Sequence, residues 1–445
     1  MNAVPGPLRS VLAALLLILA SVSFVTVQTL PHTKTSPVDE YMYIDYLAKF
    51  PEQGIITRGE DTGTFAREYI SCHGVLTRKA PDMEYCAAGD FSDPDRFSRG
   101  GKSSADIYTP LYFGATWAMS QPILATTDLN IVQAGRLTGA VWMAGAALFL
   151  FGAIRRLGMN RVTATAVPLL MVGSLPSWWS ATYLSTDVTL FTFGAALAYL
   201  LVRQLADRRW GWSALLVATS VLGVLVKLQN LMATAVVAVA LLLTAAHDAR
   251  APRTPGVLRR LLRDRFTWIA VSAVGLSLAA QLAWMKLRPV MPDAPPPAQS
   301  LKTPLTPFAL LSETYKFLPN LMNGARNPFT HFGGWGVFLV LVVGWLIVIA
   351  VLVQAITARE RTERTLARAL LITAILGGPA LALATALAEG YYFALPARYA
   401  LGLIPFALLI VAQFCAGRRW SERALVGLGA GAFTAAMLMR YTGPQ

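Results

Sequence analysis

Three carboxylates stand where apolar segments begin or end, and each could move a proton. Asp39 and Glu40 are adjacent and follow the first apolar segment, and Asp187 directly precedes a later one. A carboxylate that is partly removed from water has a raised pKa, which suits a general base. The alternative for each acid is a helix N-terminus, where negative charge is favoured by the helix dipole. Both interpretations remain open from the sequence.

Cations occupy similar positions, and a cation at the edge of hydrocarbon is costly enough to suggest a functional site. Arg398 stands at the start of an apolar segment, and Lys227 falls between the apolar runs 211–226 and 231–245. Such side chains could neutralise a phosphate group; the alternative is snorkelling to the membrane interface. In order of preference, the candidates are Arg398, Lys227, Lys286 and Arg288.

Composition shows what must position these groups. Of the 445 residues, 55% are hydrophobic and 14% are charged, with a mean hydropathy of +0.51. A water-soluble domain usually carries about 25% charged residues, so the sequence excludes a soluble protein. It predicts an all-α polytopic membrane protein of about 11 transmembrane helices. The apolar stretches are 9–30, 134–154, 162–180, 187–205, 211–227, 229–246, 267–287, 333–356, 367–388, 398–416 and 424–440.

Arginine clusters alternate with these stretches and predict the orientation of the chain. Loops rich in Lys and Arg face the cytoplasm, which leaves residues 31–133 as one long outside loop. Within that loop, 36–50 and 108–127 are expected to lie at the membrane surface without crossing. The net charge of +14 then reflects topology and contact with anionic lipid rather than a nucleic-acid partner.

Two cysteines lie in the long outside loop. Cys72 and Cys86 are close enough to form a disulfide in an oxidising compartment. Two further segments are expected to be interfacial: the basic cytoplasmic linker 247–266 and the segment 307–324, which follows a proline-rich linker. No histidine cluster or zinc-ligand spacing is present in the sequence.

The order of these features resembles the GT-C superfamily of membrane glycosyltransferases. The matching segments are Asp39-Glu40 after the first span, Tyr108-Thr109-Pro110-Leu111-Tyr112-Phe113, Arg136 in Gln133–Leu137, Asp187, and Ala397-Arg398-Tyr399 with Pro405. The chain looks most similar to a bacterial family of predicted multi-spanning proteins with a "PxDExxxxxxY…PPLYY" signature. It departs from that signature at Thr109-Pro110 and after Glu40, where Tyr-Met follows, and these departures leave the acceptor class open.

The resemblance implies a division of the chain: a catalytic module 1–246, the linker 247–266, and a C-terminal membrane module 267–445 with an outside loop 288–332. It also implies a multi-pass protein of the bacterial inner membrane, with its active site on the extracytoplasmic side. The donor would be a polyprenyl-phosphate sugar and the acceptor a glycan, lipid or protein, with no nucleic acid involved.

On this interpretation Asp39 or Glu40 removes the proton of the acceptor hydroxyl in a single inverting displacement. Asp187 orients the acceptor, or helps Asp39 to hold Mg²⁺ or Mn²⁺ if a metal binds. The substrate-lining residues would be Tyr43, Tyr108, Tyr112, Arg136, Tyr391, Tyr392 and Tyr399. The alternatives are a lipid or glycan transporter (a flippase) without covalent chemistry, and a non-catalytic scaffold of the cell envelope.

Overall fold

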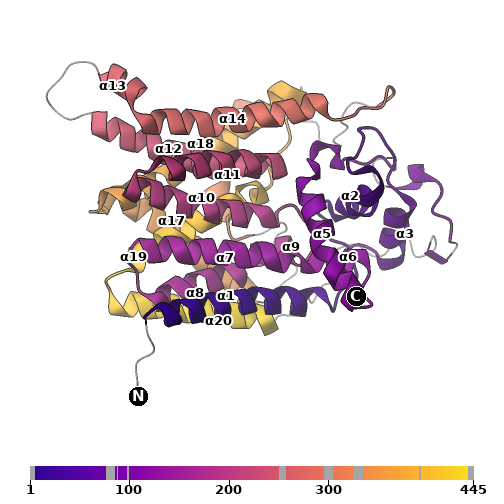
Figure 1. Cartoon of the computed structure of the whole chain (residues 1–445), viewed down its shortest axis with the longest axis horizontal. Coiled ribbons are helices and arrows are strands. Elements are labelled where there is room, and N and C mark those ends of the chain that lie inside the picture. Colours follow the sequence, from indigo (N-terminus) through magenta and orange to yellow (C-terminus); the bar gives the residue numbers. More distant parts are fainter. Residues whose placement is uncertain are drawn as a thin grey trace.

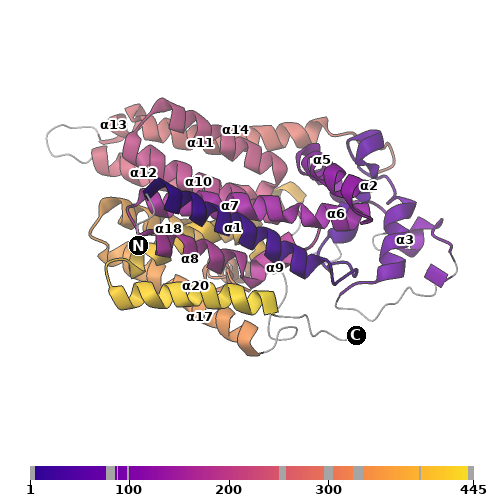
Figure 2. The same cartoon turned by 60° about the horizontal axis from the view of Figure 1, so that its bottom comes forward.

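The computed structural model describes residues 6–76, 86–87, 89–97, 100–249, 257–294, 304–323, 334–389 and 392–438. The regular structure of this described part is helical, and extended pairing is limited there to three isolated bridges. The long helices lie side by side in one bundle, with a smaller helical subdomain at one end (Figures 1 and 2). The predicted all-α membrane architecture is therefore confirmed.

Eight segments within the described residues are long and apolar enough to span a membrane. They are formed by α1 (Gly6–Thr29), α6 (Ile131–Leu137) with α7 (Gly139–Arg156), α10 (Val188–Asp207), η3 (Leu228–Asn230) with α12 (Leu231–Ala249), α14 (Arg265–Leu287), α17 (Gly334–Thr357), α18 (Arg361–Glu389), and η5 (Ala397–Leu403) with α19 (Ile404–Cys415).

The other three predicted spans are helical but do not meet this criterion: α8 (Arg161–Val172), α11 (Trp210–Val226) and α20 (Arg419–Leu438). By length and hydropathy alone, the described residues thus contain eight candidate spans, compared with the predicted number of about 11.

The stretch 162–180 was expected to be one continuous helix, and that expectation is wrong. The chain breaks after α8, and a separate helix α9 (Leu175–Ala181) begins with Ser174 as its N-cap and Pro176 in its first turn. At the break, Gly173 packs against α20 so closely that an added Cβ would lie 2.6 Å from the Cα of Phe433. A serine cap and a proline in the first turn both favour starting a new helix there.

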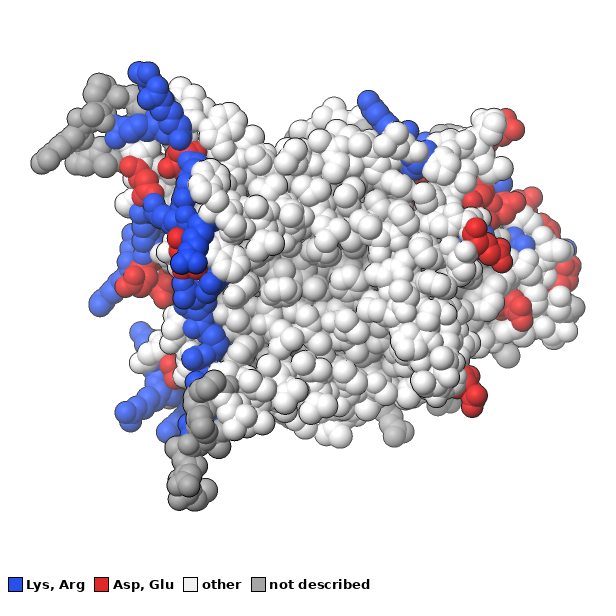
Figure 3. All heavy atoms as spheres, in the orientation of Figure 1, with Lys and Arg blue, Asp and Glu red and all other residues white. Residues whose placement is uncertain are grey.

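Charged side chains separate toward the two ends of the bundle. Lys and Arg gather at the end on the left of Figure 3, whereas Asp and Glu are prominent on the subdomain at the other end. The pale surface between them carries few charges in this view. This arrangement is that of a bundle whose middle lies in hydrocarbon.

The long loop between the first two spans builds the subdomain. Its helices are α2 (Glu40–Gln53), α3 (Thr64–His73), η1 (Pro94–Arg96), η2 (Ala105–Ile107) and α5 (Pro110–Thr126). In Figure 1, α5 runs across the direction of the long helices, as expected for a segment that does not cross the membrane. The predicted disulfide Cys72–Cys86 is present, with 4.9 Å between the two Cα atoms.

Helix α2 differs from the expected surface helix over 36–50. It begins only at Glu40, and every residue from Glu40 to Leu47 is buried. The reason is its position between the bundle and the rest of the loop, where it packs against α3 and α5. An interfacial helix would leave one face exposed along its length, whereas the first two turns of α2 are enclosed by protein.

The two smaller predicted segments are also helical in part. In the basic linker, α13 (Val257–Arg263) is present, and residues 250–256 lie outside the described residues. The segment 307–324 forms two short helices, α15 (Pro307–Thr314) and α16 (Phe317–Asn320), rather than one. Helix α15 packs on α18, and α16 contacts η5.

Candidate active site

Four charged side chains from four separate parts of the chain meet where the subdomain joins the bundle. Arg398 Nη2 lies 2.8 Å from Asp39 Oδ2, and Arg398 Nη1 lies 3.2 Å from Asp187 Oδ2. Lys227 Nζ lies 2.6 Å from Asp187 Oδ1. The result is a chain of alternating charges, Asp39–Arg398–Asp187–Lys227. We call these four residues the charged cluster.

The carboxylates of the cluster precede helices, but they do not cap them. Asp39 is the N-cap residue of α2 and Asp187 that of α10, and neither side chain bonds to a backbone N–H of its helix. Both instead reach the cations of the cluster. The simpler alternative considered for these acids, helix capping, therefore does not account for where their oxygens point.

Asp39 also has an unusual backbone. Its φ is 59°, in the left-handed region, and Arg208 is the other described non-glycine residue with positive φ. This conformation costs an L-residue roughly 1–2 kcal/mol, although Asp and Asn tolerate it best. Strain of this kind persists where the surroundings demand it, and it is frequent at functional sites. At Asp39, this backbone conformation lets the side chain point toward Arg398 while the chain turns into α2.

Exposure falls steadily along the cluster. The side chain of Asp39 is 35% exposed, that of Arg398 12%, that of Asp187 4% and that of Lys227 1%. Burial raises the pKa of Asp187, but the charges of Lys227 and Arg398 more than offset it, so the pKa lies below its ordinary value. Asp187 therefore stays ionised, and Asp39 is the carboxylate that solvent and a substrate can reach.

Hydroxyl groups surround the buried side of the cluster. Lys227 Nζ donates to Thr186 Oγ1 at 2.7 Å, and that hydroxyl donates to the Tyr43 hydroxyl at 3.2 Å. Tyr43 in turn shares a 2.9 Å hydrogen bond with Tyr108, whose ring lies 5.6 Å from Lys227 Nζ. Burial raises the pKa of Tyr43 well above its ordinary value. These phenols are thus neutral and can act as hydrogen-bond donors.

The remaining tyrosines predicted to line the site are placed as follows. Tyr399 lies beside the cluster, with its ring centroid 5.7 Å from the Arg398 guanidinium carbon. The Tyr112 hydroxyl accepts from the backbone N–H of Ser185 and is buried. Tyr392 donates to Glu313 instead of facing the cluster. Tyr391 lies outside the described residues.

Glu40, the neighbour of Asp39, belongs to a different network. It is fully buried, and both of its oxygens pair with Arg136, at 2.7 and 3.0 Å. The same carboxylate accepts from the backbone N–H groups of Ser36, at 2.6 Å, and Leu184, at 2.8 Å. With four such contacts and no exposure, it has no free position for a substrate. The alternative that Glu40 is the base is therefore not supported by its surroundings.

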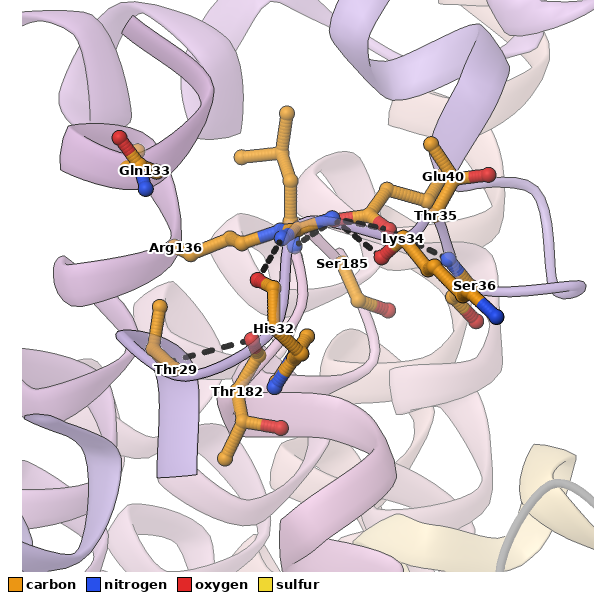
Figure 4. A network of polar contacts seen from close by, with 12 residues as sticks. Thr29, His32, Lys34, Thr35, Ser36, Glu40, Gln133, Arg136, Thr182 and Ser185 are labelled. Carbon is orange, nitrogen blue, oxygen red and sulfur yellow. Dashed lines mark hydrogen bonds and ion pairs between the residues drawn. The ribbon is translucent and has the colours of Figure 1, made fainter. Parts of the chain in front are cut away.

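Arg136 was expected to line the substrate site, but it is fully buried, and its guanidinium N–H groups donate hydrogen bonds to groups inside the protein. Besides Glu40, it donates to the carbonyls of His32, at 3.1 Å, and Lys34, at 3.0 Å (Figure 4). It thereby ties the segment after α1 to the start of the second span. Burial and the charge of Arg136 lower the pKa of His32 to about 4, so that its ring is neutral.

Two of the predicted phosphate-binding cations lie outside the cluster. Arg288 pairs with Asp106, and both side chains are buried. Lys286 is exposed and takes part in no ion pair within the described residues. Arg288 is thus already neutralised, and the role of Lys286 remains a prediction.

The predicted option of a divalent metal fits the cluster poorly. The guanidinium of Arg398 already bridges Asp39 and Asp187, the two suggested ligands. Across the part of the chain that the structure describes, no group of three His, Cys, Asp or Glu side chains is arranged to hold an ion. A Mg²⁺ or Mn²⁺ ion that bridged these two carboxylates would have to displace the Arg398 guanidinium.

Two contributors were missed from the sequence. Thr186 was overlooked because a single hydroxyl carries no pattern, although it precedes Asp187 directly. Glu313 is fully buried in α15 and accepts hydrogen bonds from the Tyr392 hydroxyl, at 2.6 Å, and the backbone N–H of Leu395, at 3.1 Å. It therefore anchors the segment just before Arg398. The signal available in the sequence was that Glu313 is the one acid in the predicted interfacial segment 307–324.

Comparison with known proteins finds similarity in fold but not in sequence. No family model matches the chain, and no curated protein matches its sequence. The fold is similar to the crystal structure of ArnT from Cupriavidus metallidurans in the apo state, with a TM-score of 0.46 and 12% sequence identity. The match covers 92% of this chain and 61% of that one. The present chain thus spans about three fifths of the length of that structure.

Proposed function

We propose that the protein is an inverting membrane glycosyltransferase that moves a sugar from a polyprenyl-phosphate donor to an acceptor in the cell envelope. The observation that carries this proposal is the carboxylate of Asp39. It is the exposed end of a charged cluster at the rim of an apolar bundle. Such a place brings together a lipid carrier from the membrane and an acceptor from water.

Asp39 acts as the general base in this proposal. Its Oδ2 pairs with Arg398, and no hydrogen bond to Oδ1 is found within the described residues. That oxygen is available to a hydroxyl of the acceptor. As the acceptor oxygen bonds to the anomeric carbon, its proton passes to Asp39. Attack opposite to the leaving group inverts the configuration in one step.

The leaving group departs as polyprenyl phosphate and takes the electrons of the broken carbon–oxygen bond. Arg398 is the more exposed of the two cations of the cluster, which supports a role in pairing with the phosphate oxygens. Lys227 lies deeper and supports the same charge from behind Asp187. Phosphate is a good leaving group, so no general acid is needed.

Asp187 acts as a positioning residue in this scheme. It is buried, ionised and in contact with both cations. Without it, Arg398 and Lys227 would repel each other in a site of low dielectric constant. Its carboxylate keeps them together before the donor arrives, which is the preorganised arrangement that electrostatic catalysis needs.

The charge distribution supports an orientation. Asp39 directly precedes α2 of the outer subdomain, whereas Lys and Arg gather at the opposite end of the bundle, which the positive-inside rule would place in the cytoplasm (Figure 3). The disulfide Cys72–Cys86 belongs to the same outer subdomain, as an oxidising compartment would allow. Both observations support an active site on the extracytoplasmic side, and the bacterial inner membrane is the location that we propose.

The test is turnover of a panel of polyprenyl-phosphate pentoses and hexoses by the purified chain, with a membrane extract as the source of acceptor. We expect release of polyprenyl phosphate from at least one donor, and inversion at the anomeric carbon by NMR. Arg398→Gln should weaken donor binding at least tenfold, since a charge-assisted contact is lost. The control Lys102→Gln removes a cation of the outer subdomain that pairs with Asp61 outside the cluster, and it should leave binding unchanged.

A different outcome would refute this proposal. If the folded protein binds such lipids but cleaves no sugar–phosphate bond, and instead moves the intact lipid across a liposome membrane, the transporter alternative holds.

A further inference from the structure

A cavity of about 700 Å³ lies at the other end of the bundle from the charged cluster. It is formed where α1, α8 and α20 pack together, with the end of α7 beside them. Its charged lining consists of Arg9, Arg155 and Arg161, and its apolar lining includes Leu169, Val426 and Ala430. The cavity therefore joins a cationic mouth to an apolar wall.

These three arginines differ from their neighbours at the same end. Arg156 and Arg203 pair with Asp207, and Arg208 and Arg361 pair with Asp248. The basic residues at this end are thus partly neutralised by aspartates within the fold.

The cavity arginines have no acidic partner among the described residues. Arg155 donates to the carbonyl of Met159, and Arg161 Nε donates to the Ser10 hydroxyl at 3.1 Å. Both contacts orient the guanidinium groups without neutralising them. Glu422 accepts a hydrogen bond from Asn160, another lining residue, at 3.0 Å, but it forms no ion pair with these arginines within the described residues. The three positive charges around one cavity therefore favour binding of an anion from outside the chain.

We infer that this cavity binds one molecule of an anionic phospholipid. A phosphodiester headgroup would pair with Arg9, Arg155 and Arg161, and an acyl chain would lie along Leu169, Val426 and Ala430. Guanidinium groups suit phosphate because their planar donors can bond two oxygens at once. Basic pockets between membrane helices bind anionic headgroups in this way. The site is separate from the charged cluster and does not depend on the proposed reaction.

Native mass spectrometry of the full chain in detergent tests this inference. The probes are phosphatidylglycerol and phosphatidylcholine with identical acyl chains, and inorganic phosphate alone. We expect one phosphatidylglycerol to be retained, phosphatidylcholine to bind at least tenfold more weakly, and inorganic phosphate not to compete at equal concentration. Arg9→Gln combined with Arg161→Gln should weaken phosphatidylglycerol binding about 25-fold, at roughly fivefold per arginine.

Two further variants keep the test decisive. Arg209→Gln removes an exposed arginine of the α10–α11 turn, at the same end but away from the cavity, and should bind like the unmodified chain. Ala430→Phe leaves every charge in place but fills the apolar wall, and should also lose the lipid. Equal loss in Arg209→Gln and the double variant would show unspecific attraction to a basic surface. Unchanged binding in both the double variant and Ala430→Phe would overturn the inference.

Discussion

Replacing Asp39 with asparagine separates its proposed chemical role from its structural one. Asparagine has nearly the same shape and tolerates the left-handed backbone found at this position. The substitution removes the base and one ion pair. Because Asp39 is 35% exposed, screening limits that pair to about 1 kcal/mol or less. We therefore expect the melting temperature in detergent to change little.

Activity should respond far more strongly than stability. A positioned general base contributes about 10²–10⁴-fold in rate, so kcat for sugar transfer should fall by that factor in Asp39→Asn. The KM for the donor should stay the same or decrease, because Arg398 loses a competing carboxylate and becomes freer to pair with phosphate. The assay is initial-rate release of polyprenyl phosphate over a range of donor concentrations.

The split between kcat and KM decides the interpretation. If kcat is retained within tenfold while KM rises, Asp39 serves to position Arg398 and is not the base. Asp39→Ala is the matched comparison for the backbone: it loses the same charge but keeps the strain of the left-handed conformation, which alanine tolerates less well than asparagine. It should be less stable than Asp39→Asn by about 1 kcal/mol.

Three other predictions concern the structure around the site. Arg136→Met leaves the buried charge of Glu40 unpaired and should lower the free energy of unfolding by about 3–5 kcal/mol; adding Glu40→Gln should recover part of that loss in chemical denaturation. The pKa of His32 is lowered to about 4 in the folded chain. Between pH 6.5 and 4, His32 is therefore protonated in the unfolded chain but neutral in the folded chain. Stability should therefore fall by up to about 3 kcal/mol between pH 6.5 and 4, and this part of the slope should vanish in His32→Gln. Cys72→Ser with Cys86→Ser should increase protease cleavage and hydrogen exchange in the outer subdomain, whereas reductant should have no further effect on this variant.

The membrane architecture was largely predictable because it depends on composition summed over long segments. An apolar stretch near 20 residues in length predicts a span without knowledge of its neighbours. The predicted continuous stretch 162–180 failed because a local signal, a serine cap followed by proline at Ser174 and Pro176, interrupts it. Window averages do not register such a signal.

The charged cluster was predictable for a similar reason. An ion at the edge of hydrocarbon needs a partner, and Asp39, Asp187, Lys227 and Arg398 are each other's partners. Their pairing could not be read from spacing, since it depends on how the spans pack.

The division of roles between Asp39 and Glu40 was beyond sequence reasoning. It depends on where α2 begins and on the left-handed backbone of Asp39. A helix over the expected range 36–50 would have left the two acids as equivalent candidates. In the structure, the turn at Asp39 leaves the Asp39 carboxylate at the rim beside Arg398, whereas the Glu40 carboxylate points inward to Arg136.

The sequence separations of these contacts also imply an order of biogenesis. Glu40 can find Arg136 once 96 further residues have been made, so the outer loop can be anchored as soon as the second span arrives. Asp39 must wait for Arg398, which comes 359 residues later. A nascent chain would thus carry an ordered outer loop long before it carries a complete site. If the proposed function holds, the chain becomes active only after the segment that carries Arg398 has been inserted, and a chain truncated before that segment would be inserted but inactive.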